Sequence, residues 1–81
     1  MNETDLRGVV AAALEEVAPG SDLEEIDADE DFTYELDIDS MDFLNFVIAV
    51  HEKTGIDIPE RDYPKLSSLN KAMAYLRGAA V

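Results

Sequence analysis

Apolar residues recur at helical spacing in the first part of the chain. They occupy positions i, i+3, i+4, i+7, i+8 and i+11, and the residues are Leu6, Val9, Val10, Ala13, Leu14 and Val17. This spacing places them on one face of a helix. Asn2 or Thr4 can cap the start of this helix, and Pro19 followed by Gly20 is expected to end it.

A second helix is predicted to begin at Ser40, with Asp39 as its N-cap, because an aspartate there accepts hydrogen bonds from unpaired backbone N–H groups. Its apolar stripe contains Met41, Leu44, Val47, Ile48 and His51, and Phe43, Phe46 and Val50 widen the stripe on one flank. A helix that is apolar over so much of its circumference is expected to pack against several neighbours in the middle of the bundle. Gly55 suits the left-handed position that follows its last turn.

The segment after Gly55 predicts a connector and a short helical turn. Ile56 and Ile58 precede Pro59, and a proline keeps the residue before it in an extended conformation. Residues 60–66 can form a short helical turn, although the proline within them limits its regularity.

A last helix is predicted to follow Ser67 or Ser68, either of which can cap it. Its inward positions are Leu69, Ala72, Met73 and Leu76, and Arg77 lies near its C-terminus. The predicted fold class is therefore all-α: a four-helix bundle made of three main helices plus a short third helix. The 81 residues are enough for one domain, which we place at 1–81.

Between the first two main helices, residues 21–39 have no hydrophobic period, and single apolar residues interrupt a run of acids. A loop of this length in so small a domain is uncommon and is often functional. Phe32 and Leu36 are expected to anchor it to the core. The pattern therefore predicts a long acidic loop between helices one and two.

The charge of the chain is strongly one-sided. Six basic residues against nineteen acidic ones give a formal net charge of −13 at pH 7. Eleven carboxylates, with no Lys or Arg among them, belong to Asp22, Glu24, Glu25, Asp27, Asp29, Glu30, Asp31, Glu35, Asp37, Asp39 and Asp42. Such a field repels nucleic acid and anionic membranes and attracts proteins with basic patches. A merely solubilising surface is the alternative, although such surfaces usually intersperse both signs.

The residue types that the chain lacks exclude other chemistries. It has no cysteine, so any thiol chemistry must come from an attached group. No apolar run has the length of a membrane span, and residues 1–5 lack the basic and apolar regions of a signal peptide. We expect a soluble, cytoplasmic and monomeric protein with no nucleic-acid partner and no membrane insertion.

Ser40 is the one candidate for covalent chemistry. His51, the only histidine, returns to nearly the same face of the predicted helix but lies roughly 16 Å further along its axis. A nucleophile and its base must be in hydrogen-bond contact, so an intact helix allows no Ser–His pair, and no enzyme activity is predicted. From the residues alone, Ser40 could simply share the capping role of Asp39.

Two acidic series have the spacing that opens a calcium loop. Residues 27–31 carry aspartates at alternate positions, but Phe32 and Ile38 stand where the loop needs glycine and glutamate. The acidic series at residues 35–39 likewise lacks the glycine and the glutamate that a calcium loop needs. No metal site is predicted.

The sequence Phe-Thr-Tyr-Glu-Leu-Asp-Ile-Asp-Ser-Met-Asp at 32–42 resembles the attachment region of acyl carrier proteins, a family of phosphopantetheine-binding carriers. That region has an Asp-Ser-Leu or Asp-Ser-Met core after a leucine. The similarity continues through Gly-Ile-Asp-Ile-Pro at 55–59 and Leu-Ser-Ser-Leu at 66–69 to Tyr75 and Leu76. It spans essentially the whole chain.

The resemblance implies a non-catalytic carrier. A phosphopantetheinyl transferase would move phosphopantetheine from coenzyme A onto Ser40, and the thiol of this arm would carry acyl groups between enzymes. Those enzymes would transfer, ligate or condense acyl groups and dock through basic patches. The expected docking residues are Asp39, Met41, Asp42 and Glu52. The candidate residues of an acyl pocket are Phe32, Phe46, Val50, Ile58, Tyr63, Leu66 and Ala72.

Four positions depart from the family pattern. Asp37 stands where glycine is frequent, and aspartate tolerates unusual backbone angles. Asn45 and His51 stand where carriers of fatty-acid synthesis are often acidic, and Tyr63 where a small residue is common. Within the fatty-acid, polyketide and other lipid pathways, these departures favour a specialised one. An aminoacyl or peptidyl carrier, or an acidic interaction module with an unmodified Ser40, are the alternatives.

Overall fold

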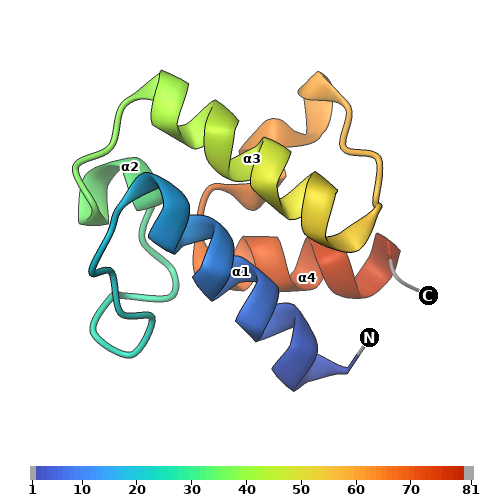
Figure 1. Cartoon of the computed structure of the whole chain (residues 1–81), viewed down its shortest axis with the longest axis horizontal. Helices are drawn as coiled ribbons and strands as arrows, with labels where there is room; N and C mark the ends of the chain where they lie inside the picture. Colours follow the sequence, from blue (N-terminus) through green and yellow to red (C-terminus); the bar gives the residue numbers. More distant parts are fainter. Residues whose placement is uncertain (1, 80–81) are drawn as a thin grey trace.

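The computed structural model describes residues 2–79, so residues 1 and 80–81 of the predicted domain lie outside the described part. It contains five helical elements in chain order: α1 (Glu3–Val17), α2 (Phe32–Glu35), α3 (Ser40–Thr54), the 3-10 helix η1 (Glu60–Leu66) and α4 (Leu69–Ala79). Figure 1 shows α1 lying against both α3 and α4, while η1 packs on α4. The described residues include no strand, which confirms the all-α prediction of three main helices and a short third one.

α1 begins and ends at local signals. The Asn2 side chain accepts a hydrogen bond from the Asp5 N–H at 2.8 Å and caps the first turn, as predicted. The helix ends at Val17, two residues before Pro19. Its buried residues are Leu6, Val10, Ala13 and Leu14, which form the centre of the predicted stripe. No helix among residues 2–79 combines the length and the apolar character that a membrane span requires.

α3 is held by caps at both ends. The Asp39 carboxylate accepts a hydrogen bond from the Asp42 N–H at 2.9 Å, and the Asp42 carboxylate accepts a longer one from the Asp39 N–H at 3.5 Å. This reciprocal arrangement is a capping box. At the other end Gly55 adopts a left-handed conformation, with φ of 74°, which a side chain would disfavour. Both predicted caps are confirmed.

The buried face of α3 differs from the predicted stripe. Its buried residues are Phe46, Val47, Ala49 and Val50. By contrast, Met41 is 64% exposed and Ile48 is 43% exposed. The helix was predicted to pack against several neighbours, and it contacts both α1 and α2. Within the predicted stripe Val47 is buried, whereas the side chains nearer the surface face the Asp57–Tyr63 segment.

The acidic loop contains the short helix α2, which the sequence did not predict. Asp31 caps it by accepting a hydrogen bond from the Thr33 N–H at 2.8 Å. The Phe32 side chain is fully buried, and its ring meets the Phe46 ring edge-on at 5.3 Å between centroids. Leu36 packs partly against the same core. Both predicted anchors are confirmed, and a four-residue helix is too short to produce a hydrophobic period.

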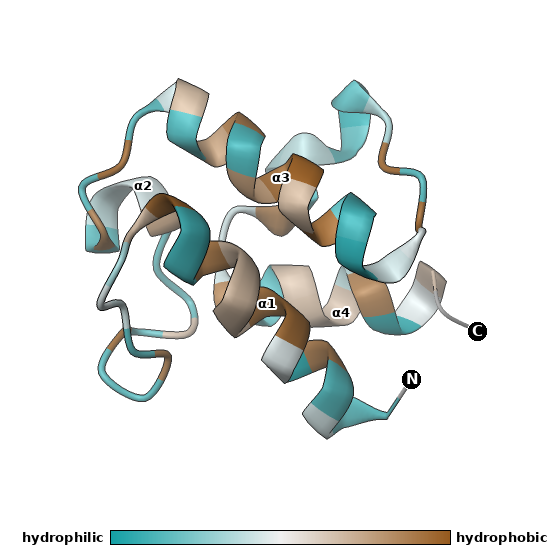
Figure 2. Cartoon of the chain, in the orientation of Figure 1, coloured by the Kyte–Doolittle hydropathy of each residue, from teal (hydrophilic) through white to brown (hydrophobic). Residues whose placement is uncertain are grey.

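Several loop carboxylates stabilise turns. Asp22 accepts from the Glu24 N–H and Asp27 from the Asp29 N–H, both at 2.9 Å. Asn70 of α4 donates from its side chain to Asp29 at 2.6 Å, which fastens the loop to the last helix. Figure 2 shows the loop as mostly hydrophilic, with isolated apolar residues. These acids therefore give an aperiodic segment a defined path.

The last helix follows its predicted cap. The Ser68 hydroxyl accepts a hydrogen bond from the Lys71 N–H at 3.2 Å. The buried residues of α4 are Leu69, Ala72, Met73 and Leu76, as the pattern predicted.

Candidate functional site

Ser40 is the first residue of α3 and is exposed. Its position depends on the backbone just before it. Asp37 has φ of 52°, the only positive φ of a non-glycine residue within 2–79, and this turn is followed by the buried Ile38 and the capping Asp39. The chain is thus anchored at Ile38 and capped at Asp39 immediately before the serine. The Ser40 side chain is displayed at the surface, at the N-terminal end of a stable helix.

A cavity of about 490 Å³ opens beside Ser40. Its α3 wall consists of Ser40, Met41, Phe43 and Leu44, and its η1 wall consists of Glu60 and Tyr63. Most of this lining is apolar, although Glu60 and the Tyr63 hydroxyl are polar. The cavity therefore offers an apolar shelter that begins at the exposed serine.

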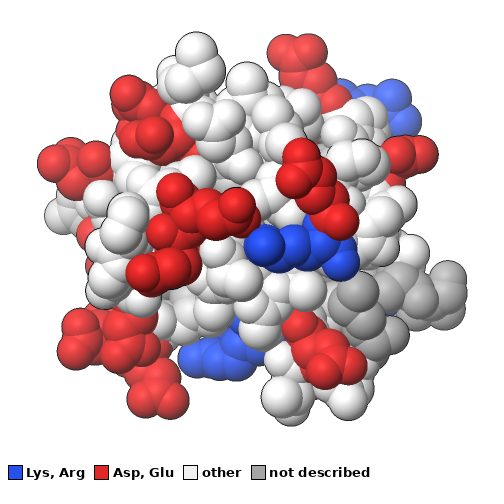
Figure 3. Space-filling view, viewed as in Figure 1, with Lys and Arg blue, Asp and Glu red and all other residues white. Residues whose placement is uncertain are grey.

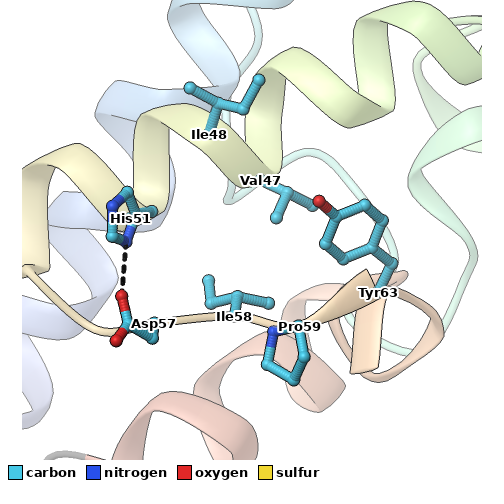
Figure 4. A pocket seen from close by; sticks show the side chains of 7 residues that line it. All are labelled: Val47, Ile48, His51, Asp57, Ile58, Pro59 and Tyr63. Atoms are coloured by element: carbon cyan, nitrogen blue, oxygen red, sulfur yellow. Dashed lines mark ion pairs between the residues drawn. The ribbon is translucent and has the colours of Figure 1, made fainter. Parts of the chain in front are cut away.

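A second cavity of about 480 Å³ lies further along α3 (Figure 4). It is lined by Val47, Ile48, His51, Asp57, Ile58, Pro59 and Tyr63. The α3 residues of the two cavities follow one another along a single helix face, and they include all five residues of the apolar stripe predicted for this helix. Tyr63 lines both cavities. Together the two cavities form one groove between α3 and the Asp57–Tyr63 segment, which we call the α3–η1 groove.

The structure divides the predicted acyl-pocket residues into two groups. Ile58 and Tyr63 line the α3–η1 groove. The other candidates have no exposed surface and belong to the closed core beneath the groove: Phe32, Phe46, Val50, Leu66 and Ala72. The groove residues that were not singled out as pocket candidates, such as Leu44 and Val47, had a signal in the sequence, namely the apolar stripe along this helix.

The far end of the groove has a polar rim. The His51 Nδ1 lies 2.7 Å from the Ile56 carbonyl oxygen and 3.9 Å from an Asp57 carboxylate oxygen (Figure 4). A carbonyl can only accept, so Nδ1 must carry a proton. Ser40 and His51 stand at opposite ends of the groove on an unbroken helix. This arrangement excludes the nucleophile–base pair, as the sequence predicted.

The wall formed by η1 is fastened to α4 by one side-chain hydrogen bond. The Tyr75 hydroxyl donates to the Asp62 carboxylate at 2.9 Å, and Lys65 lies 3.4 Å from the same carboxylate group. The bond from Tyr75, together with the charges of Lys65 and Arg61, lowers the pKa of Asp62. Burial raises the pKa of Tyr75, and the bond to Asp62 adds to the effect. Both directions favour the ionised carboxylate and the neutral phenol.

Asp42 and Glu52, two of the predicted docking residues, both line a hollow between α1 and α3. It has a volume of about 370 Å³ and is lined by Glu16, Val17, Asp42, Asn45, Ile48, Ala49 and Glu52. Glu16 comes from α1, and sequence reasoning did not select it. Its carboxylate lies 3.3 Å from the Lys53 ammonium. We call this surface the acidic hollow.

The other two predicted docking residues lie outside the acidic hollow. Asp39 is exposed at the N-cap of α3, and Met41 lines the α3–η1 groove beside Ser40. Figure 3 shows acidic side chains spread over the visible face, with only a few basic ones among them. No group of His, Asp and Glu side chains suited to a metal ion is found within residues 2–79.

Comparison with known proteins agrees with this geometry. Residues 4–76 match the family model described as a phosphopantetheine attachment site. The chain is 33% identical over 78 residues to an acyl carrier protein of Renibacterium salmoninarum, covering 96% of this chain and 94% of that protein. It is 31% identical over 77 residues to an acyl carrier protein of Myxococcus xanthus, covering 95% of each. An acyl carrier protein of an Arthrobacter species is 32% identical over 78 residues, covering 96% of this chain and 94% of that protein.

Proposed function

Since the chain belongs to the phosphopantetheine-binding carrier proteins, a family of non-catalytic carriers that includes the acyl carrier proteins, we propose that Ser40 is its attachment site and that its cargo is an acyl group. The arm, once attached, supplies the thiol on which the cargo is held as a thioester. The exposure of Ser40 at the first position of α3 is the observation that carries this proposal.

The surroundings of Ser40 suit a phosphodiester in two ways. The N-terminus of a helix presents N–H groups and partial positive charge, both of which favour a phosphate. The apolar cavity beside Ser40 can shelter the cargo that the arm carries. The carboxylates of Asp39 and Asp42 repel the negative charge of a phosphodiester. The capping box, however, holds both carboxylates against backbone N–H groups.

The base for the attachment reaction has to come from the partner. His51 is held at the far end of the α3–η1 groove by the Ile56 carbonyl. The Asp39 carboxylate is occupied as the N-cap of α3, where it accepts a hydrogen bond from the Asp42 N–H. A phosphopantetheinyl transferase would therefore activate the Ser40 hydroxyl, and the carrier contributes an accessible and well-positioned oxygen.

Partner enzymes are proposed to dock on the acidic hollow and on the start of α3. The hollow combines the carboxylates of Asp42, Glu52 and Glu16 with apolar surface from Ile48. A basic patch with an apolar centre would complement this surface. Asp39 and Met41 extend it toward Ser40, so that an enzyme bound there would reach the arm.

The proposed pathway is a specialised one within fatty-acid, polyketide or other lipid biosynthesis. Asn45 is neutral in the acidic hollow, and the bulky Tyr63 stands in the α3–η1 groove. Both residues depart from the pattern of carriers of fatty-acid synthesis. An aminoacyl carrier is the second candidate, since it would use the same serine and the same arm.

Intact-mass measurement tests the attachment site. The wild-type chain, treated with coenzyme A and a transferase of broad specificity, should gain the mass of one arm. Ser40→Ala should gain nothing and keep its helical circular dichroism, because Asp39 still caps α3. Ser21→Ala is the matched control and should be modified like the wild type. Modification of Ser40→Ala, or an unmodified wild type, would contradict the proposal.

A further inference from the structure

The α3–η1 groove has a direction. One wall is formed by successive turns of α3, from Ser40 to His51, and the other by residues 57–63, which run the opposite way. At 1.5 Å per residue, the α3 wall is roughly 16 Å long. The groove therefore begins at the proposed attachment oxygen and ends at the polar rim of His51 and Asp57.

Tyr63 interrupts this groove midway. It is the one residue that lines both cavities, and in Figure 4 it stands at the end of the second cavity opposite His51. In Figure 4 its ring extends from η1 toward α3, with the hydroxyl end directed at Val47. On its Ser40 side the wall of α3 ends at Leu44, and on its other side it resumes at Val47.

The ring of Tyr63 has a supported position. The preceding residue, Asp62, accepts the hydrogen bond from Tyr75 of α4 at 2.9 Å, and Asp62 also pairs with Lys65. The bond from Tyr75 fixes η1 against α4 next to the residue that carries the ring, and the pair with Lys65 lies within η1. A ring on a fastened segment can act as a divider, whereas a side chain on a loose loop would swing aside.

We propose that Tyr63 limits the length of acyl chain that the α3–η1 groove shelters. A short acyl group fits on the Ser40 side of the ring, and the distal part of a longer one is left in water. This inference rests on the proposed attachment at Ser40. The inference assigns one occupant to the groove, namely the acyl cargo of the arm attached at Ser40. From this attachment point the arm can place its cargo against the apolar surface of Met41, Phe43 and Leu44.

The wild-type chain alone provides the first test. It is loaded with straight-chain acyl groups of increasing length, and the rate of thioester cleavage by hydroxylamine is measured together with the rise in melting temperature on acylation. Protection should increase with chain length and then stop increasing. Each further methylene that became sheltered would slow cleavage by up to about fourfold, so a continuing increase over the whole series would overturn the proposal.

Substitutions of Tyr63 test whether its ring divides the groove. Tyr63→Ala should join the two cavities and let protection continue to increase with the longest chains. Tyr63→Phe keeps the ring without the hydroxyl and should reproduce the wild-type limit. Tyr34→Ala, which removes an exposed tyrosine that lines neither cavity, is the matched control and should also reproduce it. Identical chain-length profiles for Tyr63→Ala and wild type would contradict the proposal, and so would a Tyr63→Phe variant that behaved like Tyr63→Ala.

A titration without covalent attachment separates this inference from the proposed function. Free acyl-pantetheine thioesters of the same lengths are added to the unmodified chain, and the amide resonances of Val47 and Ile48 are followed by NMR. Long chains should shift them in Tyr63→Ala and leave them unchanged in the wild type. That result together with an unmodified Ser40 would refute the attachment and keep the divider. Equal shifts in both proteins would refute the divider, whatever happens at Ser40.

Discussion

The Tyr75 hydroxyl of α4 donates a hydrogen bond to the Asp62 carboxylate of η1 at 2.9 Å, and this bond links the last helix to the wall of the groove. Tyr75→Phe removes it and should lower the melting temperature at neutral pH. Tyr34→Phe, which changes an exposed tyrosine, should leave the melting temperature unchanged.

The stability that Tyr75→Phe removes should depend on pH, and this dependence follows from two pKa shifts. The pKa of Asp62 is lowered by folding, so its contribution to stability is present above the ordinary value of 3.8 and disappears as the pH falls through the folded value. The pKa of Tyr75 is raised by folding, so its contribution is present below 10.0 and disappears as the pH rises through the folded value. The difference between Tyr75→Phe and wild type should therefore be largest from about pH 5 to pH 9 and shrink on both sides. A difference that stays constant from acid to alkaline pH would contradict this account.

The capping box of α3 should be measurable in the free energy of unfolding. Asp39→Ala removes the acceptor of the Asp42 N–H and should destabilise the chain by about 1 kcal/mol in urea titrations. Asp39→Asn keeps an acceptor oxygen and serves as the control, with a smaller loss. If the two variants lose equally, the charge of Asp39 matters more than its hydrogen bond.

The left-handed turn at Asp37 can be tested with two variants that lose the same charge. Asp37→Gly and Asp37→Ala remove the same carboxylate, but only glycine adopts φ of 52° without strain. We expect the glycine variant to be more stable than the alanine variant by about 1 kcal/mol. Chemical denaturation of the pair measures this difference. An alanine variant as stable as the glycine variant would show that the turn relaxes.

Charge reversal should map the docking surface. Asp42→Lys and Glu16→Lys each place a positive charge in the acidic hollow and should slow association with the transferase severalfold at low salt. Glu24→Lys is the control and should have little effect, because Glu24 lines a different hollow, together with Arg7 of α1. Added salt should reduce the differences because it screens exposed charges. Equal slowing by all three variants would point to net charge alone.

The acids from Asp22 to Asp42 predict a stabilising effect of salt. Eleven carboxylates with no Lys or Arg among them repel one another in the folded chain, so added NaCl should raise the melting temperature. Magnesium chloride should also raise the melting temperature, because it screens the same carboxylates. A melting temperature that does not change with salt concentration would show that the turns and caps offset this repulsion.

The elements that the sequence predicted correctly depend on local contacts. The caps formed by Asn2, Asp39 and Ser68 each bind an N–H three residues along the chain. Gly55 ends α3 through its own backbone freedom. A signal of this kind is complete within one turn of helix, and so it can be read without knowing what the helix packs against.

Other features depend on partners distant in sequence. The stripe of α3 from Met41 to His51 is largely apolar, yet all five of its residues line a groove, because α1 packs elsewhere on this helix. Five of the seven candidate pocket residues lie instead in the closed core. Hydrophobic spacing identifies which residues avoid water but not which neighbour covers them.

The sequence by itself determined the three main helices with their caps, the short helical turn before the last helix, the acidic loop with its anchor Phe32, and the serine at the start of α3. Each of these follows from residue type and spacing over a few positions. Only the tertiary structure decided that Glu16 of α1 joins Asp42 in the acidic hollow, that Tyr75 binds Asp62, and that Tyr63 divides the groove. These three relationships join side chains from different elements, and their geometry is set by how the helices pack, which no local pattern encodes.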